Sequence, residues 1–196
     1  MDLKKTNIRL IQASNACTGS TVLVNILQGL FDYEKKIWFF FRVSKEKLTK
    51  AFLNSFIIKT HKQDIDEIIN NYYGNTFDYW IISSNRGNKI YSCKHPNCIS
   101  FEYEQLVETT TNSIETIVNT VAQKLKTALP NNITNQMDIN ASIQRIKNMN
   151  ALYEQIKNQP FRYANWPERK SQEVQTLVSM AQFYEIHGQH RNRKKL

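Results

Sequence analysis

The chain has 196 residues, of which 41% are hydrophobic and 22% are charged, and this balance excludes wholesale disorder. The formal net charge of +9 predicts an anionic partner, a class that includes nucleic acids, nucleotides and acidic glycans. No stretch reaches the roughly 20 apolar residues of a membrane span, and the N-terminus lacks the apolar run of a signal peptide. We therefore expect one soluble domain over residues 1–196, in the reducing cytoplasm and without a membrane partner.

Strand and helix patterns alternate along the first half of the chain. Short apolar runs predict strands, and apolar residues at i, i+3 and i+4 spacing predict helices between them. The predicted strands cover residues 8–13, 38–43, 55–60, 77–83 and 98–101. This alternation predicts an α/β fold, with a mostly parallel central sheet of about five strands flanked by helices.

Helical patterns dominate the second half of the chain, beyond a core that we expect over about residues 7–128. An apolar stripe that runs from Ile114 to Leu125 predicts a helix, and Asn112 followed by Glu115 predicts a capping box at its start. The polar segment from Pro130 to Gln136 predicts a loop. Two further helices, at about 137–156 and 168–184, and a basic tail are expected in the remaining segment, residues 137–196.

The three cysteines are Cys17, Cys93 and Cys98, and an odd, sparse set of this kind is not typical of a disulfide framework. The segment from Cys93 to Cys98 also contains His95, which gives three possible metal ligands within six residues. A structural zinc site needs four ligands, so we expect no metal here. A turn at His95-Pro96 between two strands is the simpler interpretation.

In a parallel sheet, ligands collect at the carboxyl ends of the strands. After the first predicted strand, the residues Cys17-Thr18-Gly19-Ser20-Thr21 open a helix. A helix N-terminus presents free N–H groups and a positive dipole, Gly19 lets an anion approach, and the hydroxyls add donors. The segment therefore predicts a phosphate site, although it lacks the Gly-Lys-Ser/Thr triplet of an NTPase loop. An ordinary helix start capped by a hydroxyl side chain is the alternative.

The third predicted strand ends in Lys59-Thr60-His61. A histidine titrates near neutrality and can accept a proton from an alcohol, and a lysine can stabilise the charge on a departing phosphate. Because both residues stand at the end of a strand, they are predicted to face the loop after the first strand. A single Lys-x-His pair also suits an ordinary protein surface.

Taken together, these segments resemble the sulfotransferases that use 3′-phosphoadenosine 5′-phosphosulfate (PAPS). In that family a strand leads into a Lys/Arg-Ser/Thr-Gly-Ser/Thr-Ser/Thr loop, and a later strand ends in Lys-Thr-His. A Tyr-Glu-Asp-Leu motif follows, which Tyr103-Glu104-Gln105-Leu106 resembles. The resemblance covers about residues 8–125. It implies a P-loop-like nucleotide-binding topology and transfer of a sulfuryl group to a hydroxyl or amine acceptor. A chain of 196 residues leaves few insertions for a deep acceptor pocket, so we expect a large or exposed acceptor, such as a glycan.

The resemblance also implies a role for each matching residue. His61 would be the general base, and Lys59 would stabilise the leaving oxygen, with no metal required. The donor PAPS would be bound by Cys17, Thr18, Gly19, Ser20, Thr21, Arg86, Ser92, Arg191 and Arg193. For Arg191 and Arg193 the alternative is a solvated basic terminus.

Two departures from the family pattern keep alternatives open. Cys17 stands where the family has a basic residue, and the spacing from Arg86 to Ser92 is shorter than in the family, which makes Ser84 the alternative ligand. A nucleotide-binding protein without transfer activity is therefore one alternative. Another is a basic module that binds nucleic acid, but its aromatic residues would interleave with Lys and Arg on one face, whereas here they fall in core-like strands.

Overall fold

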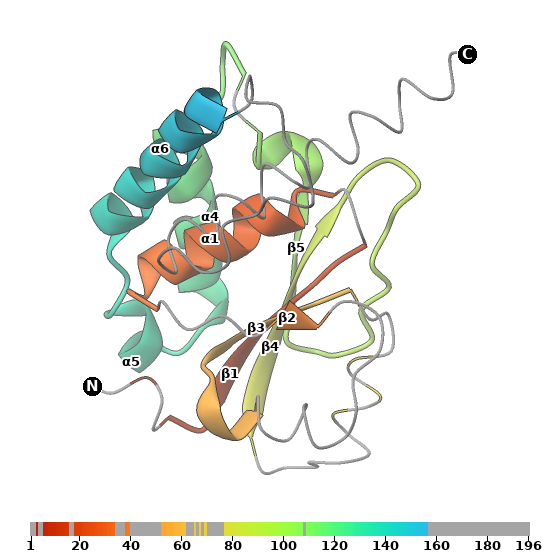
Figure 1. Cartoon of the computed structure of the whole chain (residues 1–196). Coiled ribbons are helices and arrows are strands. Elements are labelled where there is room, and N and C mark those ends of the chain that lie inside the picture. Colours follow the sequence, from red (N-terminus) through yellow and green to blue (C-terminus); the bar gives the residue numbers. More distant parts are fainter. Residues whose placement is uncertain are drawn as a thin grey trace, which may run out of the picture. The chain divides into compact units, whose positions relative to one another are not determined.

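The computed structural model describes residues 3, 6–15, 18–33, 38–39, 52–61, 65, 67, 69, 77–107 and 109–156 (Figure 1). The chain divides into two compact units, residues 1–145 and 146–196. Within the second unit the described residues belong to the end of one helix, so the predicted helix at 168–184 and the basic tail lie outside the described residues. The candidate site belongs to the first unit.

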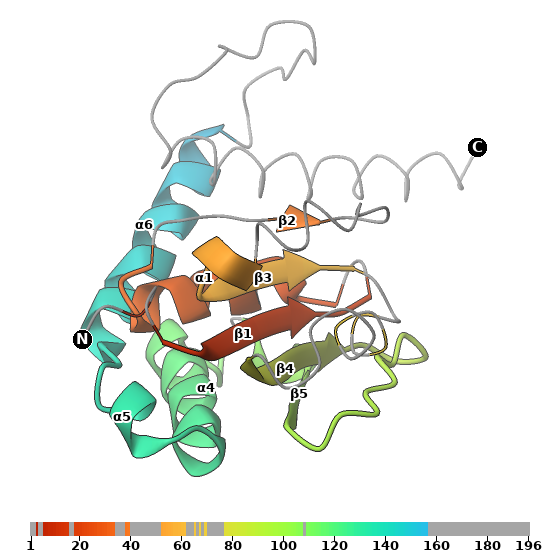
Figure 2. The ribbon, with the colours of Figure 1, turned by 90° about the horizontal axis from the view of Figure 1, so that it is seen from below.

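A parallel sheet forms the centre of the first unit. Its strands are β1 (Ile8–Ala13), β2 (Trp38–Phe39), β3 (Ile57–Thr60), β4 (Asp78–Asn85) and β5 (Cys98–Glu102). They lie in the order β2-β3-β1-β4-β5, and every neighbouring pair is parallel (Figure 2). The predicted α/β fold with a parallel central sheet is confirmed. β4 runs two residues beyond its predicted end at Ser83, while residues 40–43 of the second predicted strand lie outside the described residues.

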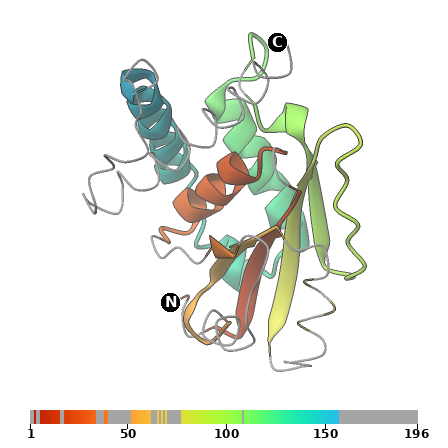
Figure 3. The same ribbon diagram turned by 45° about the vertical axis from the view of Figure 1, so that its right-hand side comes forward.

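The helices are α1 (Ser20–Leu30), the short 3₁₀ helix η3 (Tyr103–Gln105), α4 (Ile114–Ala128), α5 (Asn131–Thr134) and α6 (Ile139–Ile156). α1 and α4 pack against each other and lie together on one face of the sheet (Figure 3). None of the helices in the described part of the chain is long and apolar enough to cross a membrane.

Two predictions about the helices were wrong. The N-cap of α4 is Ser113, whose Oγ accepts a hydrogen bond from Thr116 N at 3.3 Å. Asn112 does not cap the helix, because its side-chain amide donates instead to the carbonyl oxygens of Glu104 and Val107. The polar segment predicted as a loop contains the one-turn helix α5, which follows Pro130 as its N-cap.

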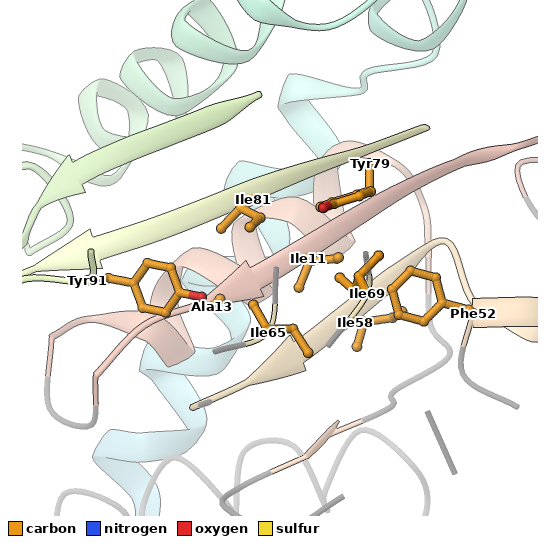
Figure 4. Close-up of a cluster of buried hydrophobic side chains, with 9 residues drawn as sticks. All are labelled: Ile11, Ala13, Phe52, Ile58, Ile65, Ile69, Tyr79, Ile81 and Tyr91. Atoms are coloured by element: carbon orange, nitrogen blue, oxygen red, sulfur yellow. The ribbon is translucent and has the colours of Figure 1, made fainter. Parts of the chain in front are cut away.

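Successive side chains of a strand point to opposite faces of the sheet, and this alternation builds two different layers. One face carries the hydrophobic cluster of Figure 4, in which Ile11, Ile58 and Ile81 of three neighbouring strands pack together. The remaining members of the cluster are Ala13, Phe52, Ile65, Ile69, Tyr79 and Tyr91. The alternate residues of β1 and β3, which include Gln12 and Lys59, point to the opposite face, where α1 lies.

The strand order places β1 at the point where the direction of the chain reverses. From β1 the chain passes to β2 and β3 on one side of it, and then to β4 and β5 on the other side. Ligands of parallel α/β proteins bind outside the carboxyl ends of the strands at such a switch point. The topology therefore directs attention to the residues that follow β1, β3 and β4.

The cysteines on either side of the predicted turn at His95-Pro96 differ from expectation. Cys93 and Cys98 form a disulfide at the start of β5, although the odd cysteine count led us to expect free thiols. The pair is close because a bend at His95–Asn97 folds the segment back before β5 begins. Asn97 stabilises this bend, since its backbone N–H donates to His95 Nδ1 at 3.2 Å.

Candidate functional site

The helix α1 begins without a side-chain cap. Its N-cap is Gly19, which has a left-handed backbone (φ 82°) and no side-chain hydrogen bond to the helix. The first backbone bond of the helix runs from Leu23 N to Gly19 O at 3.0 Å, so the earlier N–H groups have no acceptor within the helix. The alternative of a hydroxyl-capped helix start therefore does not hold. The N–H groups without a helical acceptor and the helix dipole give this end a positive potential.

The hydroxyl groups of Thr18 and Ser20 do not cap the helix. Thr18 Oγ1 donates to Asn15 O at 2.8 Å and lies 3.0 Å from Ser84 Oγ. Ser20 is buried, and its Oγ has no hydrogen-bond partner within the described residues. Helical side chains lean toward the N-terminus of their helix, so this hydroxyl lies by the uncapped end. A buried polar atom without a partner is costly, and a bound anion or water would satisfy it.

Lys59 brings a buried amine beneath the first turn of α1. Its side chain is 3% exposed, and Nζ donates a hydrogen bond to Thr21 Oγ1 at 2.9 Å. This contact follows from the alternation along β3, which turns Lys59 toward α1 and Ile58 toward the opposite cluster. Burial disfavours the charged form and lowers the pKa of Lys59 to about 7. An anion at the end of α1 would stabilise the protonated amine.

His61 follows β3 directly and is buried. Its Nδ1 lies 2.7 Å from the carbonyl oxygen of Ser14, which can only accept, so Nδ1 carries the proton. The second ring nitrogen, Nε2, is then the basic atom of the neutral ring. The pKa of His61 is lowered, and the largest cause is burial. The hydrogen bond to Ser14 raises the pKa, whereas the nearby charge of Lys59 lowers it further. The imidazole is therefore neutral near pH 7, as a general base must be.

Ser14 joins the ends of β1, β3 and β4, and sequence analysis did not single it out. Its Oγ lies 2.7 Å from both Gln12 Nε2 and the backbone nitrogen of Ser84, and 3.0 Å from Ser84 Oγ. The same residue holds His61 through its carbonyl group. Ser84, the alternative to Ser92, thus lies against the loop after β1. The register between β1 and β4 would have revealed that Ser14 and Ser84 are neighbours. Gln12 is aligned with Ile82, and each serine stands two residues further along its strand direction.

The Tyr103–Leu106 segment lies against the same loop. A Cβ added at Gly19 would be 3.2 Å from Leu106 Cδ1 and 3.3 Å from Tyr103 Cδ2. The guanidinium carbon of Arg86, which follows β4, lies 4.0 Å from the centre of the Tyr103 ring. This geometry is a cation–π contact, and it orients the guanidinium beside the loop. The three motifs that carry the resemblance therefore come together around the start of α1.

The other predicted donor ligands are not part of this cluster as the structure describes it. Ser92 is exposed in the connection between β4 and β5, and it makes no hydrogen bond to any described residue. Cys17, Arg191 and Arg193 lie outside the described residues. Among the residues that the structure describes there is no group of three or more His, Cys, Asp or Glu that could hold a metal ion.

Comparisons with protein-family models, with curated proteins and with solved structures find no match for this chain. The arrangement of side chains at the start of α1 therefore carries the functional argument.

Proposed function

We propose that the protein is a PAPS-dependent sulfotransferase that moves a sulfuryl group to a hydroxyl or amine acceptor. The observation that carries this proposal is the uncapped start of α1, with Gly19 as its N-cap and the buried Ser20 hydroxyl beside it. Lys59 adds a buried amine within hydrogen-bond distance of the same turn. Free N–H groups, a hydroxyl and an ammonium group match the oxygen atoms of a phosphosulfate.

The sheet supports the same proposal at the level of topology. β1 lies between β3 and β4, and the loop after it leads into α1 at the switch point of the sheet. We infer a P-loop-like nucleotide-binding topology, as in sulfotransferases, in which this loop holds the 5′-phosphosulfate. Arg86, oriented by Tyr103, would bind the 3′-phosphate.

In the proposed reaction the acceptor oxygen or nitrogen attacks sulfur in line with the bridging oxygen. The new bond to sulfur forms as the bond between sulfur and the bridging oxygen breaks. The electron pair of that bond leaves with 3′,5′-bisphosphoadenosine, and Lys59 stabilises the negative charge that develops there. The acceptor proton passes to His61 Nε2, because Nδ1 is already engaged by Ser14.

The test is formation of 3′,5′-bisphosphoadenosine from PAPS, followed by chromatography, with a panel of glycan and small hydroxyl acceptors. We expect the intact chain to release the bisphosphate and His61→Asn to release it about 10²–10⁴-fold more slowly, because the base is lost. Asn119→Ala is the control, since Asn119 is exposed on α4 and its side-chain amide donates to Glu115 O in the same helix. Release no faster than in a protein-free sample would remove the transferase proposal, and full activity of His61→Asn would remove only the assignment of the base.

A further inference from the structure

The connection between β4 and β5 starts at the candidate site and ends at a disulfide. Arg86 is its first residue, and Cys93 is joined to Cys98, the first residue of β5. Both cysteines are only partly buried. The segment thus contains a chemically reversible bond within a few residues of Arg86.

Two hydrogen bonds attach this connection to the site. Asn15, which follows β1, donates from Nδ2 to Ile90 O at 3.1 Å. The backbone nitrogen of Tyr91 donates to Asn85 Oδ1 at 3.0 Å, at the end of β4. Asn15 also accepts the hydrogen bond of Thr18 through its carbonyl oxygen. The position of the connection is therefore coupled to the loop that opens α1.

The hydrophobic cluster provides a second route between the disulfide and the site. Cys93 and Cys98 pack against the cluster, which contains Tyr91 of the connection and Ala13 at the end of β1. Figure 4 shows the Tyr91 ring beside Ala13, the residue that precedes Ser14. Packed interiors transmit small displacements, so a change at the sulfur atoms reaches the end of β1.

We propose that the Cys93–Cys98 disulfide is a redox-responsive site whose reduction loosens the β4–β5 connection and weakens binding of the sulfuryl donor. This inference rests on the proposed function, because it names a regulation of the same site. In a reducing compartment, which the sequence predicts, protein disulfides are usually transient and redox-sensing. Cys98 is aligned with Ile81, so the disulfide and Arg86 lie at opposite ends of the β4–β5 pairing, and residues 86–92 link the two.

The reaction is thiol–disulfide exchange with a dithiol reductant. One thiolate of the reductant attacks a sulfur of the Cys93–Cys98 bond and forms a mixed disulfide, which releases the other cysteine as a thiolate. The second thiolate of the reductant then displaces the bound cysteine and closes its own disulfide. The reductant thereby supplies two electrons and two protons, and the protein gains two thiols.

The experiment compares air-oxidised protein with protein reduced by dithiothreitol, using calorimetric titration with 3′,5′-bisphosphoadenosine. We expect the reduced form to bind at least about fivefold more weakly, within the usual range of coupling between sites. Hydrogen exchange should rise in residues 86–92 on reduction while α1 stays protected. The matched control is the double variant Cys93→Ala and Cys98→Ala, which keeps Cys17 and should bind weakly with or without dithiothreitol.

The outcomes separate this inference from the proposed function. Equal affinity of the oxidised and reduced protein would overturn the redox inference and leave the proposed function standing. Global loss of circular dichroism on reduction would also overturn it, because the bond would then be a structural staple. Failure of the bisphosphate to bind in either state would remove the proposed function, and the redox inference with it.

Discussion

A lysine amine is seldom buried, and the environment of Lys59 has a measurable consequence. Its pKa is lowered to about 7 by burial, whereas in the unfolded chain the amine has its ordinary value of 10.5. Between these two values the unfolded state binds a proton that the native state does not. The free energy of unfolding should therefore rise with pH across this window, because stability rises with pH wherever the unfolded state binds more protons. Below about pH 7 this contribution is constant.

The measurement is urea-induced unfolding at several pH values between 7 and 10, for the intact chain and for Lys59→Met. Methionine fills a similar volume without a titratable group, so other titrations cancel in the difference between the two proteins. We expect the pH slope of the intact chain to exceed that of the variant, and Lys59→Met to gain stability near pH 7. Parallel pH profiles would show that Lys59 titrates normally in the native state.

At the residue scale the sequence allowed part of the site to be predicted. Thr18 and His61 follow predicted strands and Lys59 stands near the end of one, and the carboxyl ends of parallel strands meet at one edge, so their proximity was predictable. Ser14 was not, because its role depends on the register between β1 and β4, which one sequence does not reveal. The Cys93–Cys98 disulfide was missed because an odd cysteine count gives no information about pairing.

At the scale of elements, the contact between η3 and the start of α1 determines the shape of the candidate site. Gly19 has a left-handed backbone, which is strained for a residue with a Cβ. An added methyl group would also crowd Tyr103 and Leu106. Gly87 is a matched control, since its φ is +54° and an added Cβ would meet nothing within 4 Å. Comparison of alanine substitutions at the two glycines separates the cost of backbone strain from the cost of crowding.

We expect both Gly19→Ala and Gly87→Ala to lower the free energy of unfolding by about 1 kcal/mol through backbone strain. Gly19→Ala should lose more than Gly87→Ala, because Tyr103 and Leu106 must move, and overpacking adds about 1–3 kcal/mol. Urea titrations of the three proteins give the comparison. Equal decreases in the free energy of unfolding would mean that η3 moves at no cost and does not determine the position of the loop.

Element boundaries illustrate what sequence patterns can and cannot predict. The apolar stripe of α4 was sufficient to place the helix, because its buried residues recur at helical spacing. Its N-cap was assigned to the wrong residue, because Asn112 and Ser113 are both good N-caps. In the structure the side chain of Asn112 donates to the carbonyl oxygens of Glu104 and Val107, which leaves Ser113 as the N-cap. α5 was missed because a single turn after a proline has no periodicity to detect.

At the scale of the whole molecule, the charge of +9 and the uncapped start of α1 both favour an anionic ligand. Neither feature alone distinguishes a sulfuryl donor from other nucleotides. The loop lacks the Gly-Lys-Ser/Thr triplet with which NTPases bind a triphosphate and its metal, so the proposed function predicts weak binding of ATP. Selectivity for one class of nucleotide is therefore the property on which the account depends.

The most direct measurement is the shift in melting temperature caused by saturating 3′,5′-bisphosphoadenosine and, separately, by saturating ATP with Mg²⁺. A ligand at about 100 times its dissociation constant stabilises the native state by about 2.7 kcal/mol, which is readily detected. We expect a clear rise in melting temperature with the bisphosphate and a much smaller one with ATP. Equal stabilisation by both nucleotides, or none by the bisphosphate, would contradict it.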